Sequence, residues 1–192
     1  MSANIVLIGP SGTGKTTVAQ LLGAMLNRPV IELDQVRWDY YNEIGYDADY
    51  AQQLRKKQGM KGLAAYWKPF DIHAVERVLS DYPSNTIISF GAGHSVYEDK
   101  GMLEQAKRLL ANHKVILLIP SPQVDESVDI LGQRILAKEP HLTAEIVAGL
   151  SEINRFFLEH PSNYELATIT IFTKDKQPAE VSQKIIELVN SK

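Results

Sequence analysis

The sequence predicts a three-layer α/β fold, in which helices flank a five-stranded parallel sheet on both faces. Two observations lead to this prediction. Short apolar runs of strand length alternate along the chain with longer segments that have helical patterns. One such run, residues 115–119, is apolar at every position, as is typical of strands that are buried on both faces. The length of 192 residues fits a single domain, and a hydrophobic fraction of 44% is enough for an ordinary core.

The strands are expected, in chain order, at residues 5–8, 30–33, 86–90, 115–119 and 168–172. Helices are expected at residues 15–27, 47–58, 71–82, 102–111, 123–138, 143–160 and 178–189. Pro29 ends the first helix, and Pro178 lies in the first turn of the last one, where its missing N–H is not needed. Residues 34–83 are rich in polar and aromatic side chains, and we expect them to form a helical insert between the second and third strands.

The composition excludes several classes of function. No cysteine is present, which excludes disulfides, zinc sites built on thiolates and cysteine nucleophiles. A formal net charge of -3 argues against duplex nucleic acid as the main partner. No apolar run approaches the ~20 residues of a membrane-spanning helix, and the first residues lack the features of a signal peptide. We therefore expect a cytoplasmic protein, monomeric or homodimeric, without a membrane or nucleic-acid partner.

A phosphate-binding sequence follows the first strand. Residues 9–16 read GPSGTGKT and match the pattern GxxxxGK[ST] in full, between a strand and a helix. Glycines let the backbone wrap closely around phosphate oxygens, and the N-terminal end of the following helix attracts the same anion. Lys15 is expected to reach the β- and γ-phosphates of ATP, and the Thr16 hydroxyl to bind Mg2+. The predicted nucleotide-binding residues are Gly9, Pro10, Ser11, Gly12, Thr13, Gly14, Lys15, Thr16 and Thr17.

An acidic pair lies at the end of the second strand. Because parallel strands share one carboxyl edge, Asp34 is expected beside the phosphate loop, where ligands of open α/β sheets bind. There it can orient or deprotonate an attacking hydroxyl; the alternative is that it caps a helix beginning at Gln35. Glu32 either supports Mg2+ through water or is a solvated charge. Arg37 and Trp38 form either a corner of the substrate site, in which Arg37 binds an anion, or a surface arginine beside a half-buried tryptophan.

Further candidates follow the later strands. The turn after the third strand consists of Gly91, Ala92 and Gly93. It allows close backbone approach to a substrate, and the alternative is a plain turn. Arg134 is interpreted as an adenine or phosphate contact, and Lys138 as a group that closes over the γ-phosphate. Arg155 is interpreted as a third cation at the sheet edge. For Arg134 and Lys138 the alternative is a solvated helix face.

From the phosphate loop onward, the chain resembles the small-metabolite kinases of the P-loop group, and the shikimate kinases most closely. The matching features are the loop itself, the acidic pair Glu32 and Asp34, the turn Gly91-Ala92-Gly93, Arg134 before a lid-like segment, Arg155 followed by Tyr164, and Pro178. The resemblance implies the P-loop NTPase fold with strand order 2-3-1-4-5, a lid at about residues 136–145 and an adenine contact near Pro178. The chain departs from the family pattern at two cationic positions. It has Tyr66-Trp67-Lys68 near the substrate-anchoring arginine, and Lys138 in place of the lid arginine.

These features together predict an ATP-dependent phosphotransferase that transfers the γ-phosphate to a hydroxyl of a small metabolite. In this hypothesis the insert at residues 34–83 holds the acceptor and Asp34 positions it, while Lys15 acts with Arg134, Lys138 or Arg155 to neutralise developing charge. Neither the third nor the fourth expected strand ends in the aspartate typical of mechanical and signalling ATPases, which favours small kinases. Two alternatives stay open: a nucleoside or nucleotide kinase, and a nucleotide-binding regulatory protein with weak ATPase activity.

Overall fold

The computed structural model describes residues 2–190, and five parallel strands form its centre. The strand order is β2-β3-β1-β4-β5, which confirms the predicted topology. The strands are β1 Ile5–Ile8, β2 Val30–Glu32, β3 Ile87–Ser89, β4 Lys114–Ile119 and β5 Ile169–Phe172. Because every pairing is parallel, the carboxyl ends of all five strands lie at one edge of the sheet.

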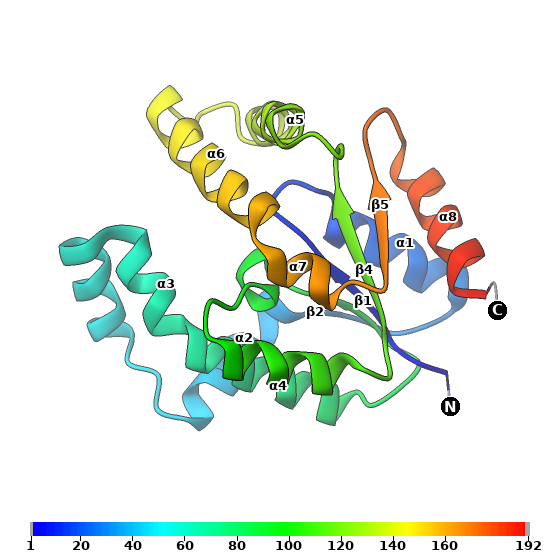
Figure 1. Cartoon of the computed structure of the whole chain (residues 1–192), viewed down its shortest axis with the longest axis horizontal. Helices are drawn as coiled ribbons and strands as arrows, with labels where there is room; N and C mark the ends of the chain where they lie inside the picture. The colour runs from blue at the N-terminus through cyan, green and yellow to red at the C-terminus, as the bar shows by residue number, and fades with distance from the viewer. Residues whose placement is uncertain (1, 191–192) are drawn as a thin grey trace.

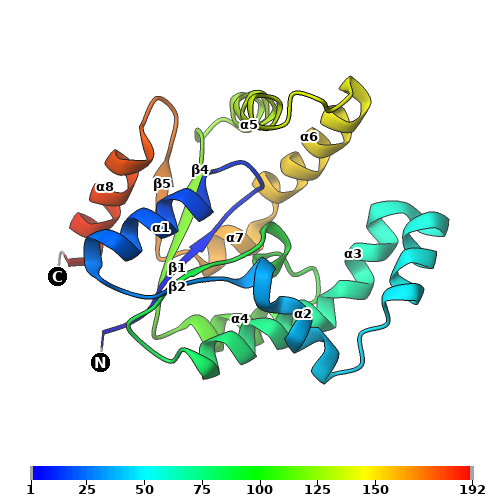
Figure 2. The same ribbon diagram turned by 180° about the vertical axis from the view of Figure 1, so that it is seen from behind.

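Helices cover both faces of this sheet. In chain order they are α1 Lys15–Leu26, α2 Leu33–Glu43, α3 Ala48–Asp81, the 3₁₀ helix η1 Ala92–Ser95, α4 Lys100–Leu110, α5 Val124–Lys138, α6 Ala144–Glu159, α7 Pro161–Leu166 and α8 Pro178–Asn190. One face carries α1 and α8, and the other carries α4 and α7 (Figure 1, Figure 2). Beyond the carboxyl end of β4 lies α5, with α6 beside it (Figure 1).

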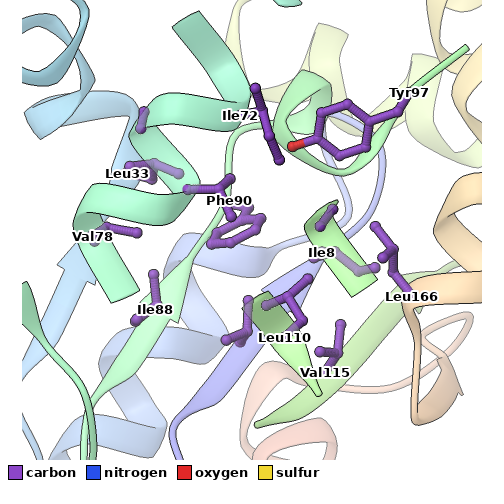
Figure 3. Close-up of a cluster of buried hydrophobic side chains, with 14 of the residues drawn as sticks. Ile8, Leu33, Ile72, Val78, Ile88, Phe90, Tyr97, Leu110, Val115 and Leu166 are labelled. Carbon is purple, nitrogen blue, oxygen red and sulfur yellow. The ribbon is translucent and has the colours of Figure 1, made fainter. Parts of the chain in front are cut away.

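Successive side chains of β1 point to opposite faces, and each face has its own core. Ile5 and Leu7 pack in the core under α1 and α8, whereas Val6 and Ile8 pack in the core that α3, α4 and α7 cover. Figure 3 shows the second core, where the ring of Phe90 lies among aliphatic side chains from the sheet and α3. Both faces are therefore dry, and each fully buried aliphatic side chain contributes about 1.5–3 kcal/mol to stability.

The insert between β2 and β3 departs most from the prediction. The sequence pattern predicts separate helices at residues 47–58 and 71–82, and α3 spans both. The helical backbone is interrupted at Gly59, whose φ of 65° and ψ of -159° are not helical, so the break follows the first expected helix directly and the second starts earlier than expected. Gly62 and Pro69 lie between the two expected helices, and their low helical propensity obscured this part of α3. The preceding helix, α2, starts directly after β2 without a side-chain cap, so no capping signal marks its beginning.

The segment expected to be a lid is a turn between two helices. Residues 139–143 connect α5 to α6, and the Thr143 side chain caps α6 by accepting a hydrogen bond from the N–H of Ile146. The expected helix at residues 143–160 corresponds to α6, after which Pro161 begins α7 in its first turn. Within residues 2–190, no helix combines the length and the apolar character that crossing a membrane requires.

Candidate functional site

The phosphate loop passes tightly over β4 between β1 and α1. A side chain at Gly9 would lie 2.3 Å from the carbonyl oxygen of Leu118, and φ at Gly9 is +134°, so only glycine fits there. Gly12 and Gly14 also have positive φ, of 83° and 89°. These three glycines turn the backbone into the concave loop that the pattern predicts, at the N-terminus of α1.

Lys15 lies inside this loop. Its ammonium donates hydrogen bonds of 2.8 Å to the carbonyl oxygens of both Gly9 and Pro10, and the residue is only 9% exposed. Burial lowers the pKa of Lys15 to about 8, although the nearby carboxylate of Asp34 works in the opposite direction. The two carbonyl oxygens hold the ammonium at the loop, and the field of Asp34 reaches it from the end of β2.

Thr16 and Glu32 bring two oxygen ligands together beside the loop. The Thr16 hydroxyl lies 3.4 Å from Oε2 of Glu32, while Gln20 donates to Oε1 over 3.0 Å. A hydroxyl and a carboxylate are ligands that Mg2+ accepts, with substrate phosphates and water completing its shell. Among the described residues no group of three histidine, cysteine or acidic side chains could hold a metal by itself. This donor set therefore fits a Mg2+ ion that arrives with the nucleotide.

Asp34 lies against the glycine turn that follows β3. A side chain at Gly91 would lie 2.1 Å from Oδ1 of Asp34, so the carboxylate rests directly on the Gly91 backbone. Asp34 lies in the first turn of α2, which begins at Leu33, so it is not the N-cap of a helix that begins at Gln35. Its side chain is 57% exposed and pairs with Nη1 of Arg37 at 3.2 Å. The carboxylate is therefore accessible at the carboxyl edge of the sheet.

Arg37 is held among aromatic rings. Its guanidinium lies 4.4 Å from the ring centroid of Trp38 and 5.3 Å from that of Trp67. The side chain is 20% exposed, and its Nε is buried without a hydrogen-bond partner among the described residues. The two tryptophans belong to an aromatic cluster that also packs α2 against α3. Aromatic packing of the insert and a fixed guanidinium are thus both present at this corner.

The sequence reasoning noted Lys68 only as part of a departure from the family pattern, and it missed Asp71. Lys68 donates to Oδ2 of Asp71 over 2.8 Å and to the carbonyl oxygen of Gly93 over 2.7 Å. Asp71 is 3% exposed and also accepts a hydrogen bond from the hydroxyl of Tyr41. The spacing of three residues on one helix turn was the available signal, but the expected helix began at Asp71 and left out Lys68.

His94 completes this buried group. The ring is 1% exposed, its Nε2 lies 3.6 Å from Oδ1 of Asp71, and neither ring nitrogen has a hydrogen-bond partner among the described residues. Burial lowers the pKa of His94, although the facing carboxylate of Asp71 works in the opposite direction. Burial alone raises the pKa of Asp71, but the facing His94, Lys68 and Tyr41 outweigh it and keep the carboxyl ionised.

The expected adenine side is a hollow between α5 and the segment that follows β5. Arg134 donates to the hydroxyl and the carbonyl oxygen of Thr173 over 3.2 and 3.1 Å. Residues of α5, together with Lys174 and Asp175, line a hollow of about 520 Å³ that includes Arg134. Pro178 begins α8 just beyond this segment. The structure thus brings Arg134 close to the turn before Pro178, and Thr173 is a contact that the sequence reasoning missed.

The two remaining cations lie farther from these groups. Lys138 is the exposed last residue of α5, directly before the turn at residues 139–143. Arg155 is 43% exposed and pairs with Asp125 of α5 at 2.6 Å and with Glu159 at 3.6 Å. Tyr164, the other residue of that predicted pair, donates its hydroxyl to the carbonyl oxygen of Leu158. None of the contacts described for these side chains reaches the phosphate loop.

The neighbour of Arg155 does reach the loop. Asn154 of α6 accepts a hydrogen bond of 3.1 Å from the N–H of Ser11 and donates one of 3.2 Å to the carbonyl oxygen of the same residue. The side chain is 1% exposed. The sequence reasoning missed this contact because 143 residues separate the two partners and a lone asparagine on a helix carries no motif.

Comparison with known proteins identifies one family. The family model described as shikimate kinase matches residues 11–190. A shikimate kinase of Marinomonas sp. (strain MWYL1) is 23% identical over 192 residues, which cover 97% of this chain and 91% of that protein. The solved structure of the shikimate kinase from Acinetobacter baumannii in complex with shikimate is 23% identical, with a TM-score of 0.66 over 100% of this chain and 94% of that one. A gluconokinase from Sinorhizobium meliloti 1021 is 15% identical, with a TM-score of 0.58 over 97% of this chain and 91% of that one.

Proposed function

Because the chain belongs to the shikimate kinase family, it is a P-loop kinase that phosphorylates a hydroxyl of a small molecule, and we propose that its acceptor is a hydroxylated metabolite with an acidic group. The fold agrees with this, since the two solved kinases have the same architecture. The identity of 23% leaves the acceptor to be argued from the site itself.

On the nucleotide side, the phosphate loop and α1 bind the triphosphate of ATP. The backbone N–H groups of the loop and the Lys15 ammonium face the phosphates, and Lys15 neutralises charge that develops in the transfer. Thr16 would hold Mg2+ directly and Glu32 would hold it through water, and the ion would supply positive charge at the phosphates. Arg134 and the segment before Pro178 hold the base, which supplies most of the nucleotide's apolar contact area.

On the acceptor side, Asp34 orients the hydroxyl that receives the phosphate. The observation that carries this role is its position on the Gly91 backbone, at the carboxyl edge and within the electrostatic reach of Lys15. A carboxylate there accepts the hydroxyl hydrogen and directs the oxygen toward the γ-phosphate. The ion pair with Arg37 holds the Asp34 carboxylate in place until the acceptor binds.

The acidic group of the acceptor is proposed from the charges around Asp34. Arg37 lies against the rings of two tryptophans, pairs with Asp34 through Nη1 and has a buried Nε without a partner among the described residues. A guanidinium can bind a carboxylate or phosphate with two hydrogen bonds. Lys68 adds a second cation beside Gly93. With a neutral acceptor Arg37 and Lys68 keep only their pairing with Asp34 and Asp71, whereas an acidic acceptor would give both cations a further anionic partner.

The proposal is tested by ADP release in a coupled assay with a panel of acceptors. The panel contains hydroxy acids, including shikimate and gluconate, their neutral polyol analogues and nucleoside monophosphates. We expect turnover with one or more hydroxy acids and at least tenfold lower kcat/KM with the matched neutral compound. Turnover restricted to nucleoside monophosphates would replace the proposal with a nucleotide kinase, and equal use of acids and polyols would contradict the acidic acceptor.

Two variants of α2 make the same test specific for Asp34. Asp34→Asn removes the carboxylate and keeps the shape, and we expect a loss of about 100-fold or more in kcat with little change in the affinity for ADP. Asp39→Asn removes the same charge from an exposed position of the same helix and is expected to leave kcat unchanged. Equal activity of the two variants would contradict the role of Asp34.

A further inference from the structure

The phosphate loop is held from outside by the two helices that flank the turn at residues 139–143. A side chain at Gly12 would meet Leu131 and Ile135 of α5 at 3.5 Å, so α5 packs directly on the loop. The preceding loop residue, Ser11, is bound by Asn154 of α6. Consecutive residues of the loop therefore contact the helix before the turn and the helix after it.

One amide makes both contacts with Ser11. Its Oδ1 accepts from the N–H of Ser11, and its Nδ2 donates to the carbonyl oxygen of Ser11. An amide side chain offers an acceptor and a donor side by side, so this pairing has a single orientation. Asn154 is 1% exposed, and a movement of α6 alone would break both hydrogen bonds at once. Ser11 and α6 are thus coupled more closely than ordinary packing would couple them.

We propose that Asn154 is a positioning residue for the nucleotide, which holds the tip of the phosphate loop and links occupancy of the loop to the position of α6 and of residues 139–143. The proposal rests on the nucleotide side of the proposed function and not on the acceptor. Since the N–H of Ser11 is committed to Asn154, the amides from Gly12 onward are left for phosphate oxygens.

The link acts in both directions. A phosphate held by the loop restricts Ser11 and, through Asn154, restricts α6 and the turn that precedes it. By thermodynamic reciprocity, a fixed α6 strengthens phosphate binding by the same factor. Lys138, at the exposed end of α5, directly precedes the same turn. Nucleotide binding therefore affects the position of this cation, although Lys138 does not touch the loop.

The test uses ADP with Mg2+, because its binding requires no acceptor. Calorimetry measures its Kd, and hydrogen exchange measures the protection of residues 139–143 that ADP induces. Asn154→Ala removes both hydrogen bonds, whereas Asn154→Asp keeps the acceptor, replaces the Nδ2 donor by an oxygen and adds a negative charge beside the loop. We expect either variant to raise the Kd for ADP about tenfold and to lose most of the induced protection even at saturating ADP.

Asn163→Ala is the matched control. Asn163 is also 1% exposed and makes two side-chain hydrogen bonds, with Ser95 and with the carbonyl oxygen of Phe157, but none with the loop. We expect it to lower the Tm as the Asn154 variants do, while the Kd for ADP stays within about twofold.

Two outcomes overturn the proposal. If both Asn154 variants bind ADP within about twofold of the wild type, the amide contributes packing only. If they bind ADP weakly but show full protection of residues 139–143 at saturation, the loop and the turn are independent. A wild-type protein that binds ADP but phosphorylates no acceptor would contradict the proposed function and leave this inference intact.

Discussion

The ammonium of Lys15 is buried against the carbonyl oxygens of its own loop, which changes the pH range in which it is charged. Its pKa falls from 10.5 to about 8, because burial outweighs the opposing field of Asp34. The free protein therefore carries the full charge only below about pH 8, and a bound triphosphate raises the pKa again. Nucleotide binding therefore depends on the protonation state of the Lys15 amine.

We predict that kcat/KM for ATP falls as the pH rises through about 8, since this parameter reports the free protein. The basic limb of kcat lies at higher pH, because the bound triphosphate stabilises the ammonium. Asp34→Asn removes the carboxylate that raises the pKa of Lys15. In this variant, the ADP affinity measured by calorimetry should therefore begin to fall at a lower pH than in the wild type. A pH profile that stays flat to about pH 10 would show that Lys15 ionises as in a free peptide.

Gly91→Ala tests the contact between the glycine turn and Asp34. The new Cβ would lie 2.1 Å from Oδ1, so the carboxylate must move, and a shift of this size costs about 100-fold in kcat. Binding of ADP, measured by calorimetry, is expected to stay unchanged because Gly91 is outside the phosphate loop. Gly93→Ala is the control, since its Cβ would meet Asp71 and Lys68 at 3.6 Å, an ordinary contact distance. Similar kcat values for the two variants would contradict this account.

Individual residues differ in how far the sequence reveals them. The loop could be predicted because its eight positions form one local pattern, and Asp34 because it follows a strand of known direction. Asn154 and Asp71 could not, since their roles depend on contacts between segments that only tertiary packing brings together. Arg155 was predicted from its resemblance to a family position, but the structure pairs it with Asp125 and Glu159, and its role stays a prediction.

At the scale of elements, close approach of α1 to β2 positions the loop against the acidic pair. A side chain at Gly23 of α1 would lie 2.3 Å from Cγ2 of Val30 and 3.1 Å from the carbonyl oxygen of Arg28. Gly149 lies in α6 with no atom within 4 Å of the position that a Cβ would take. The two glycines therefore occupy helix interiors with opposite packing.

We predict opposite effects of alanine at these two positions. Gly149→Ala should raise the free energy of unfolding by about 0.5–1 kcal/mol, because alanine is the better helix former. Gly23→Ala gains the same propensity but collides with a stiff side chain, so a net loss of about 1–2 kcal/mol is expected. Urea unfolding measures both. Stabilisation by Gly23→Ala would mean that α1 sits farther from β2 than the structure has it.

Strands and most helices could be predicted because their apolar patterns are local, whereas α2 and the middle of α3 could not. Leu33 is fully buried at the start of α2, and its burial rather than a cap fixes where the helix begins. The aromatic side chains of α3 pack against those of α2, which stabilises helical backbone that Gly62 and Pro69 weaken. Tertiary packing thus determines the helical structure of α2 and α3, the elements on the acceptor side of the site.

For the whole molecule, a nucleotide that binds only the folded protein must stabilise it. At an ADP concentration of about 100 times Kd, the expected gain is about 2.7 kcal/mol. For a domain of this size that corresponds to a rise in Tm of about 5–10 °C in differential scanning fluorimetry. We predict that EDTA removes part of this rise in Tm, because it removes the Mg2+ that Thr16 and Glu32 would bind together with the nucleotide.

The control for the metal is Glu32→Gln, which should reduce the Mg2+-dependent part of the shift and leave the remainder. Shifts that are identical with Mg2+ and with EDTA would contradict the assignment of Thr16 and Glu32. The overall topology itself could be predicted, since the resemblance implies the strand order and apolar runs imply two covered faces. The acceptor could not, because its recognition depends on side chains from β2, α2, α3 and η1 that meet only in the folded chain.

The central claim is that Asp34 directs an acceptor hydroxyl toward a γ-phosphate held by the loop. Phosphorus NMR of a reaction containing ATP, Mg2+ and the hydroxy acid chosen by the acceptor panel measures this most directly, since it shows where the phosphate goes. For the wild type, the account predicts a phosphate ester formed in an amount equal to the ADP. For Asp34→Asn, it predicts neither product, although calorimetry with ADP shows that this variant still binds the nucleotide. Inorganic phosphate as the product of the wild type, or the same ester formed at the same rate by Asp34→Asn, would contradict it.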